Sequence, residues 1–259
     1  MKKILIVILV LLPLLSMAYD FEDGGVRNAA LGDVGISSAQ DASAAVKNPA
    51  LLAYISRFSI ITDTRHYSIQ LDNDEIGQNF TYFAMPTRKY GTIALAGGMF
   101  NSNAYSEGKF GLHFGKQLLS GKLGLGLGVK TFYTDFSEIN ENKLAVDLDL
   151  GLAYKPLKNV NIGVIANNLL STDIGINSED RVPRVFGIGA SSTYGRYTVA
   201  GDLKYKDDYD KSVLFSLGSE VNFADNFDIR AGINNSYYTS GFGLKIYEKS
   251  SLIKFNKKT

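Results

Sequence analysis

Apolar and polar residues alternate most strictly along residues 144–154, which read LAVDLDLGLAY. Every second position is large and apolar, and the positions between them hold alanine, glycine, Asp147 or Asp149. A period of two is that of a β-strand with unlike faces, whereas a helix would scatter both sets around its circumference. A strand of about ten residues crosses a bilayer when it is tilted. The pattern therefore predicts a membrane-spanning strand with one lipid-facing side and one interior side that carries carboxylates.

The same alternation, broken by clusters of Gly, Pro, Asn and Asp, predicts twelve strands after residue 57. Their expected bounds are Phe58–Asp63, Gln78–Met85, Gly91–Asn101, Gly108–Leu118, Leu123–Thr134, Lys143–Lys155, Asn159–Asn168, Arg184–Tyr194, Tyr197–Lys206, Lys211–Phe223, Phe227–Asn234 and Tyr238–Tyr247. Short connections alternate with the long ones Thr64–Gly77, Asp135–Asn142 and Leu169–Pro183. Outer-membrane barrels have short periplasmic turns and longer outer loops. A further strand at Ser251–Phe255 would make the count odd, so parity favours twelve strands.

Two turns predict the register of their hairpins. If Tyr194 faces Tyr197 across Gly195-Arg196, outward Phe186 lies opposite outward Tyr205. If Phe223 faces Phe227, inward Glu220 lies opposite inward Arg230. Opposite charges directly across two strands would brace the interior of the barrel.

The first residues have the features of an export signal, with two lysines, an apolar run and Ser16-Met17-Ala18 ahead of a polar stretch. We expect cleavage after Ala18 and a mature chain of residues 19–259. No later stretch is long and apolar enough for a membrane helix, so a closed barrel is the expected way to span a membrane. The 27 basic and 26 acidic residues nearly balance, which gives no indication of a nucleic-acid partner.

Residues 19–56 are rich in alanine and glycine and do not alternate. Asp41–Lys47 reads as a short capped helix, and Pro49 favours an extended Asn48 before a second turn, Pro49–Ala53. The stretches RNAALGDVG (residues 27–35) and DASAAVKNPALLA (residues 41–53) resemble the N-terminal region of the FadL superfamily of outer-membrane barrels. The likeness is greatest to its PorV/PorQ-like branch.

The resemblance implies that residues 19–56 fold back into the barrel as a hatch that contains Asn48, Pro49 and Ala50. Residues 57–259 would form the transmembrane barrel, and the superfamily favours fourteen strands. The fold class expected is thus an all-β, antiparallel membrane barrel of twelve to fourteen strands.

The polar residues expected inside the barrel include Asp147, Asp149, Asp202, Glu220 and Arg230, together with Lys130 and Lys204. They could line a conduction path or orient a ligand, but a small barrel also fills its interior with paired charges and glycine, and we favour this second interpretation. The inward glycines Gly124, Gly126, Gly128, Gly151 and Gly163 leave room for the hatch.

The chain offers little for catalysis or for a metal. Its two histidines are His66, in the first long loop, and His113, on the interior side of a strand, and no nucleophile motif accompanies them. Asp72-Asn73-Asp74-Glu75 lacks the rest of a calcium loop. We therefore expect no enzyme, no cofactor and no metal site.

The resemblance implies two functions. PorV/PorQ-like proteins serve type IX protein secretion and surface attachment, with secretion-system or cargo proteins as partners. Other members take up lipophilic small molecules such as long-chain fatty acids. From the sequence we favour the secretion role in the bacterial outer membrane, surrounded by lipid. Passive uptake of hydrophobic solutes is the alternative, and a purely structural barrel is third.

Overall fold

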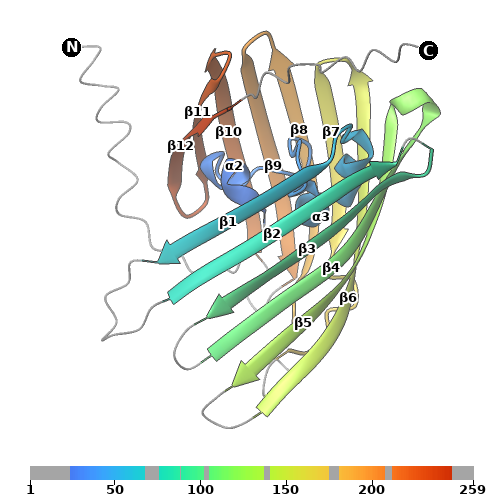
Figure 1. Cartoon of the computed structure of the whole chain (residues 1–259), viewed down its shortest axis with the longest axis vertical. Helices are drawn as coiled ribbons and strands as arrows, with labels where there is room; N and C mark the ends of the chain where they lie inside the picture. The colour runs from blue at the N-terminus through green and yellow to red at the C-terminus, as the bar shows by residue number, and fades with distance from the viewer. Residues whose placement is uncertain are drawn as a thin grey trace, which may run out of the picture.

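A computed structural model describes residues 24–67, 76–87, 89–101, 105–136, 141–174, 181–207 and 212–246. Twelve antiparallel strands form one sheet in which each strand pairs with its neighbour in the sequence (Figure 1). The strands are β1 (Ser59–Tyr67), β2 (Ile76–Thr87), β3 (Gly91–Asn101), β4 (Tyr105–Leu118), β5 (Leu123–Phe136), β6 (Glu141–Leu157), β7 (Val160–Asn167), β8 (Arg184–Tyr194), β9 (Tyr197–Asp207), β10 (Ser212–Ala224), β11 (Phe227–Asn234) and β12 (Tyr238–Leu244).

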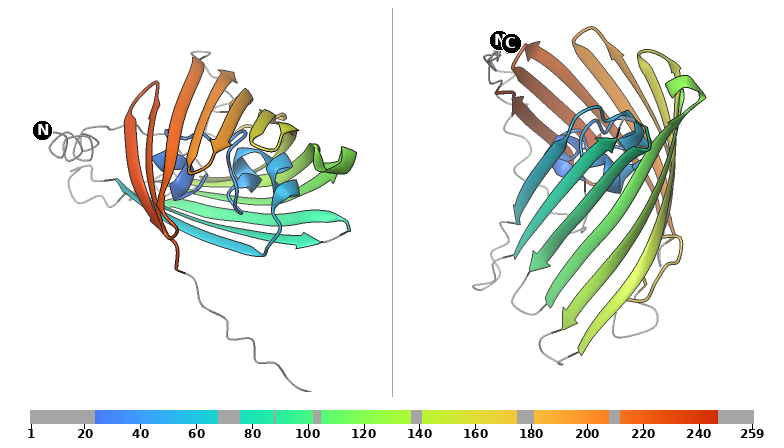
Figure 2. Two further views of the ribbon diagram at one scale, coloured as in Figure 1. Left: turned by 90° about the horizontal axis from the view of Figure 1, so that it is seen from above. Right: turned by 45° about the vertical axis from the view of Figure 1, so that its right-hand side comes forward.

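The sheet curls around the N-terminal part of the described chain, as the view from above shows (Figure 2). Hydrogen-bonded pairing runs from β1 to β12, and within the described residues these two outermost strands do not pair with each other. The helix α2 (Gly25–Ala30) contacts both β1 and β12 from inside. The interior is therefore occupied by the protein's own chain.

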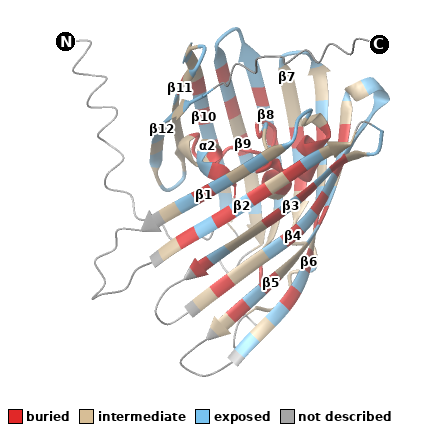
Figure 3. Ribbon diagram, in the orientation of Figure 1, coloured by how far each residue is buried: buried red, intermediate tan, exposed pale blue. Residues whose placement is uncertain are grey.

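The two faces of the sheet differ as the alternation predicts. On β6 the side chains of Leu150 and Leu152 are exposed on the outside, whereas Asp147 and Asp149 are 0% and 1% exposed on the inside. Less exposed and more exposed residues alternate along most of the strands (Figure 3). An apolar outer face and a polar inner face are the pattern of an outer-membrane barrel.

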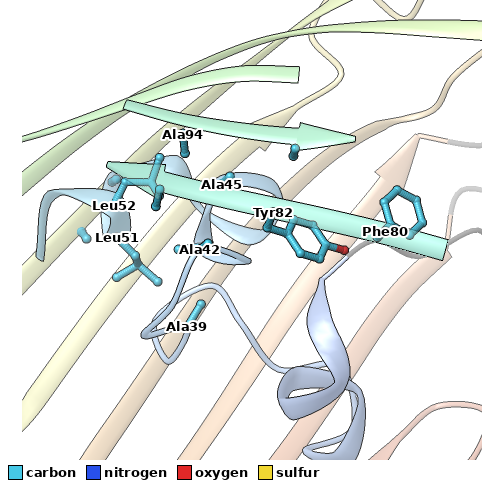
Figure 4. Close-up of a cluster of buried hydrophobic side chains, with 13 residues drawn as sticks. Ala39, Ala42, Ala45, Leu51, Leu52, Phe80, Tyr82 and Ala94 are labelled. Atoms are coloured by element: carbon cyan, nitrogen blue, oxygen red, sulfur yellow. The ribbon is translucent and has the colours of Figure 1, made fainter. Parts of the chain in front are cut away.

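The inner segment, defined as residues 24–56, holds α2, a single turn of α-helix α3 (Ala44–Lys47) and the 3₁₀-helix η2 (Pro49–Tyr54). Its small side chains pack against β2 and β3, where the fully buried Tyr82 stands beside Phe80 (Figure 4). The alanine-rich composition matters because alanine lets the backbone approach the wall closely. Asn48 is extended before Pro49, as expected.

The predicted registers hold on β8–β9, where Phe186 pairs with Tyr205. Glu220 also pairs with Arg230, but Phe223 does not pair with Phe227. A bulge between Asn222 and Ala224 shifts the register by one residue at the turn, so Ala224 takes the place opposite Phe227.

Other expectations need correction. The first loop is shorter than predicted, because β1 and β2 continue pairing up to Tyr67 and Ile76 and place His66 on β1 rather than in a loop. Helix α2 was not predicted, because the alternation of apolar and polar residues indicates strands and does not reveal so short a helix. None of the described helices is long and apolar enough to cross a membrane. The predicted signal (1–18), Asp72–Glu75 and Ser251–Phe255 lie outside the described residues.

Candidate ligand site in the barrel interior

Glycines on the inner face of the wall allow the inner segment to lie directly against the strands. A Cβ on Gly126 would come within 2.1 Å of the backbone nitrogen of Ala50, and one on Gly151 within 2.1 Å of Asn48 Oδ1. Both distances are far below a van der Waals contact, so a larger residue would displace the segment. At five other wall glycines a Cβ would come within 2.7 Å of the inner segment: Gly115, Gly124, Gly163, Gly218 and Gly232.

Asn48 joins two parts of the inner segment to the wall. Its Oδ1 accepts a hydrogen bond from Ala50 N at 3.0 Å, which caps η2. Its Nδ2 donates to Ile36 O at 2.7 Å and to Leu152 O on β6 at 3.2 Å. The side chain is fully buried, so each of these backbone carbonyls would lose one hydrogen bond without it.

Asp202, on β9, holds the loop of the inner segment that precedes α3. Its Oδ2 accepts hydrogen bonds from Gly35 N at 2.7 Å and Ile36 N at 3.0 Å. One residue further, Ser191 Oγ donates to Ser37 O at 3.0 Å. Residues 35–37 are thus fixed across the interior by side chains of two wall strands and by Asn48.

Glu220 and Arg230 belong to a charge network that also includes the inner segment. Arg230 Nε lies 2.5 Å from Glu220 Oε2, and Arg230 Nη2 lies 3.0 Å from Asp228 Oδ2. Arg27 of α2 binds the same glutamate with two nitrogens, each 3.0 Å from a carboxylate oxygen. Arg27 is the residue that the sequence did not single out, because its partner lies almost two hundred positions away.

Asp147 and Asp149 hold the loop that follows β7. Asp149 Oδ1 accepts from Asn168 N at 2.9 Å and lies 2.8 Å from Lys130 Nζ. Asp147 Oδ1 accepts from Leu170 N at 2.9 Å. These contacts draw the first part of the β7–β8 connection inward, so both carboxylates act on the backbone of that loop rather than facing an open channel.

A cavity of about 280 Å³ lies between this loop and the inner segment. It is on the side of the inner segment away from the short turns, and we call it the outer cavity. Its basic lining consists of Lys47, Lys109, Lys130, Lys204 and Lys206. Its apolar lining consists of Ile36, Val46, Phe132, Ile165, Ile174, Val182, Val185 and Leu214. Glu107 is the one carboxylate among the described lining residues. The cavity thus joins an excess of positive charge to an extended apolar surface.

Three of the lysines that line this cavity contact neighbouring side chains or backbone. Lys109 Nζ lies 3.9 Å from Glu107 and 5.4 Å from the ring centre of Phe132, and Lys130 Nζ lies 5.7 Å from the same ring centre. Lys204 Nζ contacts the carbonyl of Asp33 at 3.5 Å. An ammonium group beside an aromatic ring is attracted by the face of the ring, and the ring also contributes apolar surface.

The acidic and histidine side chains of the interior, His113 among them, are the groups that a metal site would draw on. No cluster of three or more His, Asp or Glu side chains in the described ranges is arranged to hold a metal ion. His113 is buried between the wall and the inner segment and lies against Gly111 and Gly128.

No family model and no curated sequence matches the chain. Solved structures do match it. The Pseudomonas putida toluene transporter TodX is 13% identical with a TM-score of 0.65, covering 89% of this chain and 91% of that one. The CymD monoaromatic hydrocarbon channel is 14% identical with a TM-score of 0.67 and the same coverage. A FadL homologue of Pseudomonas aeruginosa is 12% identical with a TM-score of 0.59, covering 84% and 81%.

These identities show the fold alone: the chain has the fold of FadL-family outer-membrane channels. The all-β antiparallel barrel predicted from the alternation is confirmed. The PorV/PorQ-like branch, which the N-terminal motif suggested, is not shown by these structures.

Proposed function

We propose that this chain is a passive outer-membrane channel for lipophilic small molecules that carry a carboxylate, such as long-chain fatty acids. The observation on which the proposal depends is the outer cavity, which is lined by both lysines and apolar side chains next to the inner segment. Such a lining suits a ligand with an anionic head and a hydrocarbon body, because each part finds its complement. The inner segment would act as the plug that the ligand must pass.

The apolar outer surface of the sheet supports a location in an outer membrane. Leucine, valine, isoleucine and phenylalanine side chains are exposed along the strands, and Tyr90, Tyr194, Tyr197 and Phe223 are exposed near the short turns. Aromatic side chains at a membrane interface and aliphatic side chains between the interfaces are typical of such barrels. The solved structures of similar fold are transport channels, which supports a role without catalysis.

The role in protein secretion stays a prediction. It was the function favoured from the N-terminal motif, whereas the similar structures are hydrocarbon channels and favour the alternative of solute transport. No contact in the described part of the chain identifies a secretion partner.

The proposal is tested by equilibrium binding of radiolabelled palmitate to the protein in mild detergent. We expect saturable binding in the wild type and at least tenfold weaker binding when Lys109→Gln and Lys204→Gln are combined. Lys89→Gln, a change near a short turn and away from the cavity, is the matched control and should bind like the wild type. Equal binding by all three proteins, or none by any, would refute the outer cavity as the ligand site.

A further inference from the structure

A second hollow, the inner cavity, lies on the other side of residues 35–40, toward the short turns. Its volume is about 370 Å³. Ile36 lines the outer cavity and the next residue, Ser37, lines the inner one. Its complete described lining is Ser37, Ala39, Gln40, Leu51, Tyr54, Ile55, Lys155, Lys158, Asn159, Asn161 and Thr193. One loop of the inner segment therefore separates two cavities.

The inner cavity carries positive charge without an acidic partner. Lys155 and Lys158 line it, and its described lining includes no carboxylate. Neither lysine forms an ion pair with any residue in the described ranges. Lys155 Nζ lies 3.6 Å from the centre of the Tyr54 ring. That ring positions the ammonium group and leaves its charge available to an anion.

The position of Tyr54 is fixed by the fold. Its hydroxyl donates to Ala153 O on β6 at 3.4 Å, and it belongs to the same 3₁₀-helix that Asn48 caps. Burial raises the pKa of this phenol above its ordinary value, so it stays neutral at physiological pH. The group beside Lys155 is thus a neutral ring in a defined place and cannot serve as its counter-ion.

The other residues that line the inner cavity are of two kinds, apolar and uncharged polar. Ala39, Leu51 and Ile55 form an apolar side contributed by the inner segment. Gln40, Asn159, Asn161 and Thr193 contribute amide and hydroxyl groups that can donate hydrogen bonds. A carboxylate near the two lysines could place an attached hydrocarbon chain against the apolar side.

We propose that the inner cavity is an exit site that receives the carboxylate of a lipophilic acid after it leaves the outer cavity, with Lys155 and Lys158 as its cationic ligands. The inference rests on the proposed function, because it assigns the same class of ligand to both sides of the inner segment. Two binding sites of similar chemistry, one after the other along the path, lower the barrier to movement of the ligand between them. Conduction also requires each site to bind weakly enough to release its ligand.

The test is photolabelling of the full chain in mild detergent with a palmitate analogue that carries a diazirine in its chain. Peptide mass spectrometry then locates the labelled residues. We expect label on Leu51 or Ile55 from the inner cavity and on Phe132 or Val182 from the outer cavity. The combined change Lys155→Gln and Lys158→Gln should reduce inner labelling at least fivefold and leave outer labelling unchanged. The matched control, Lys122→Gln, should keep both.

The charge requirement is tested with the methyl ester of the same probe, which should not label the inner cavity. Excess acetate, which lacks the hydrocarbon chain, should not protect it. The exit site would be overturned if labelling of the inner cavity persisted in the Lys155→Gln, Lys158→Gln protein, or if the acid and the ester labelled it equally. Labelling of the outer cavity in the same experiment would still support the proposed function. Absence of outer label in the wild type would instead count against the proposed function. Heat-modified migration on gels confirms that each variant remains a folded barrel.

Discussion

Arg27 and Glu220 form an ion pair through two nitrogens and two oxygens, each pair 3.0 Å apart, and so join helix α2 to strand β10. Their side chains are only 15% and 9% exposed, so the pair is largely removed from water. Glu220 also binds Arg230, which means that the glutamate keeps one cation if Arg27 is lost. Helix α2 is the part that would lose this attachment to the wall, while Asn48, Asp202 and Ser191 would still hold the rest of the inner segment.

Replacing Arg27 should therefore loosen the inner segment without unfolding the barrel. Breaking a buried ion pair costs about 3–5 kcal/mol when a charge is left alone. Because Arg230 still pairs with Glu220, we expect a smaller loss of about 1–3 kcal/mol for Arg27→Gln. Limited proteolysis should show faster cleavage within residues 24–56 and an intact barrel. Arg196→Gln, at an exposed turn, is the control, and equal cleavage of the two variants would contradict the prediction.

Asn48→Asp separates the two roles of the Asn48 side chain. The carboxylate can still accept from Ala50 N but cannot donate to Ile36 O or Leu152 O, and a charge is buried. Leaving a buried carbonyl such as Ile36 O without its donor costs about 1–3 kcal/mol. We expect a lower midpoint in urea unfolding than for the wild type, whereas Asn226→Asp, at an exposed turn, should change it little. An unchanged midpoint for Asn48→Asp would mean that this side chain does not anchor the segment.

Asp202→Asn tests whether residues 35–37 close the path between the two cavities. The uncharged amide accepts more weakly from Gly35 N and Ile36 N, and a hydrogen bond to a charged group is worth about 1.5–3 kcal/mol. We expect roughly a tenfold rise in the open fraction of single-channel recordings in planar bilayers. Asp225→Asn, in the β10–β11 turn, should record like the wild type. Equal open fractions for both variants would show that Asp202 does not hold the closed state.

Gly126→Val tests the close approach of the inner segment to the wall. The new side chain would occupy the position of the Ala50 backbone and push η2 away. The barrel should still form, because the outward pattern of β5 is unchanged, but the inner segment should become accessible to protease. Gly97→Ala, where a Cβ meets its nearest neighbour at 3.6 Å, should remain resistant. Protection of the inner segment in the Gly126→Val protein would contradict this packing.

The fold was largely predictable because the alternation encodes it. Asp147 and Asp149 between leucines identify a strand with two faces, and Gly195-Arg196 fixes the register of its hairpin. The bulge beside Phe223 was not predictable, since it depends on how the turn closes rather than on the faces of the strand.

The site was less predictable because its contacts join distant residues. Arg27, Lys155 and Tyr54 belong to no local sequence pattern, because their contacts depend on how the inner segment packs against β6 and β10. Asp147 and Asp149 were expected inside, but their hold on the β7–β8 loop depends on the backbone of Asn168 and Leu170. The signal that could have pointed to a site is the set of interior lysines, of which Lys130 and Lys204 were recognised.

The most direct test of the central claim is uptake of radiolabelled palmitate by Gram-negative cells that lack their own fatty acid channel. Cells with the wild-type protein in the outer membrane should accumulate palmitate several times faster than cells without it. Cells with the Lys109→Gln, Lys204→Gln protein should be close to the background rate. Uptake at the background rate by cells that carry folded wild-type protein in the outer membrane would contradict the account.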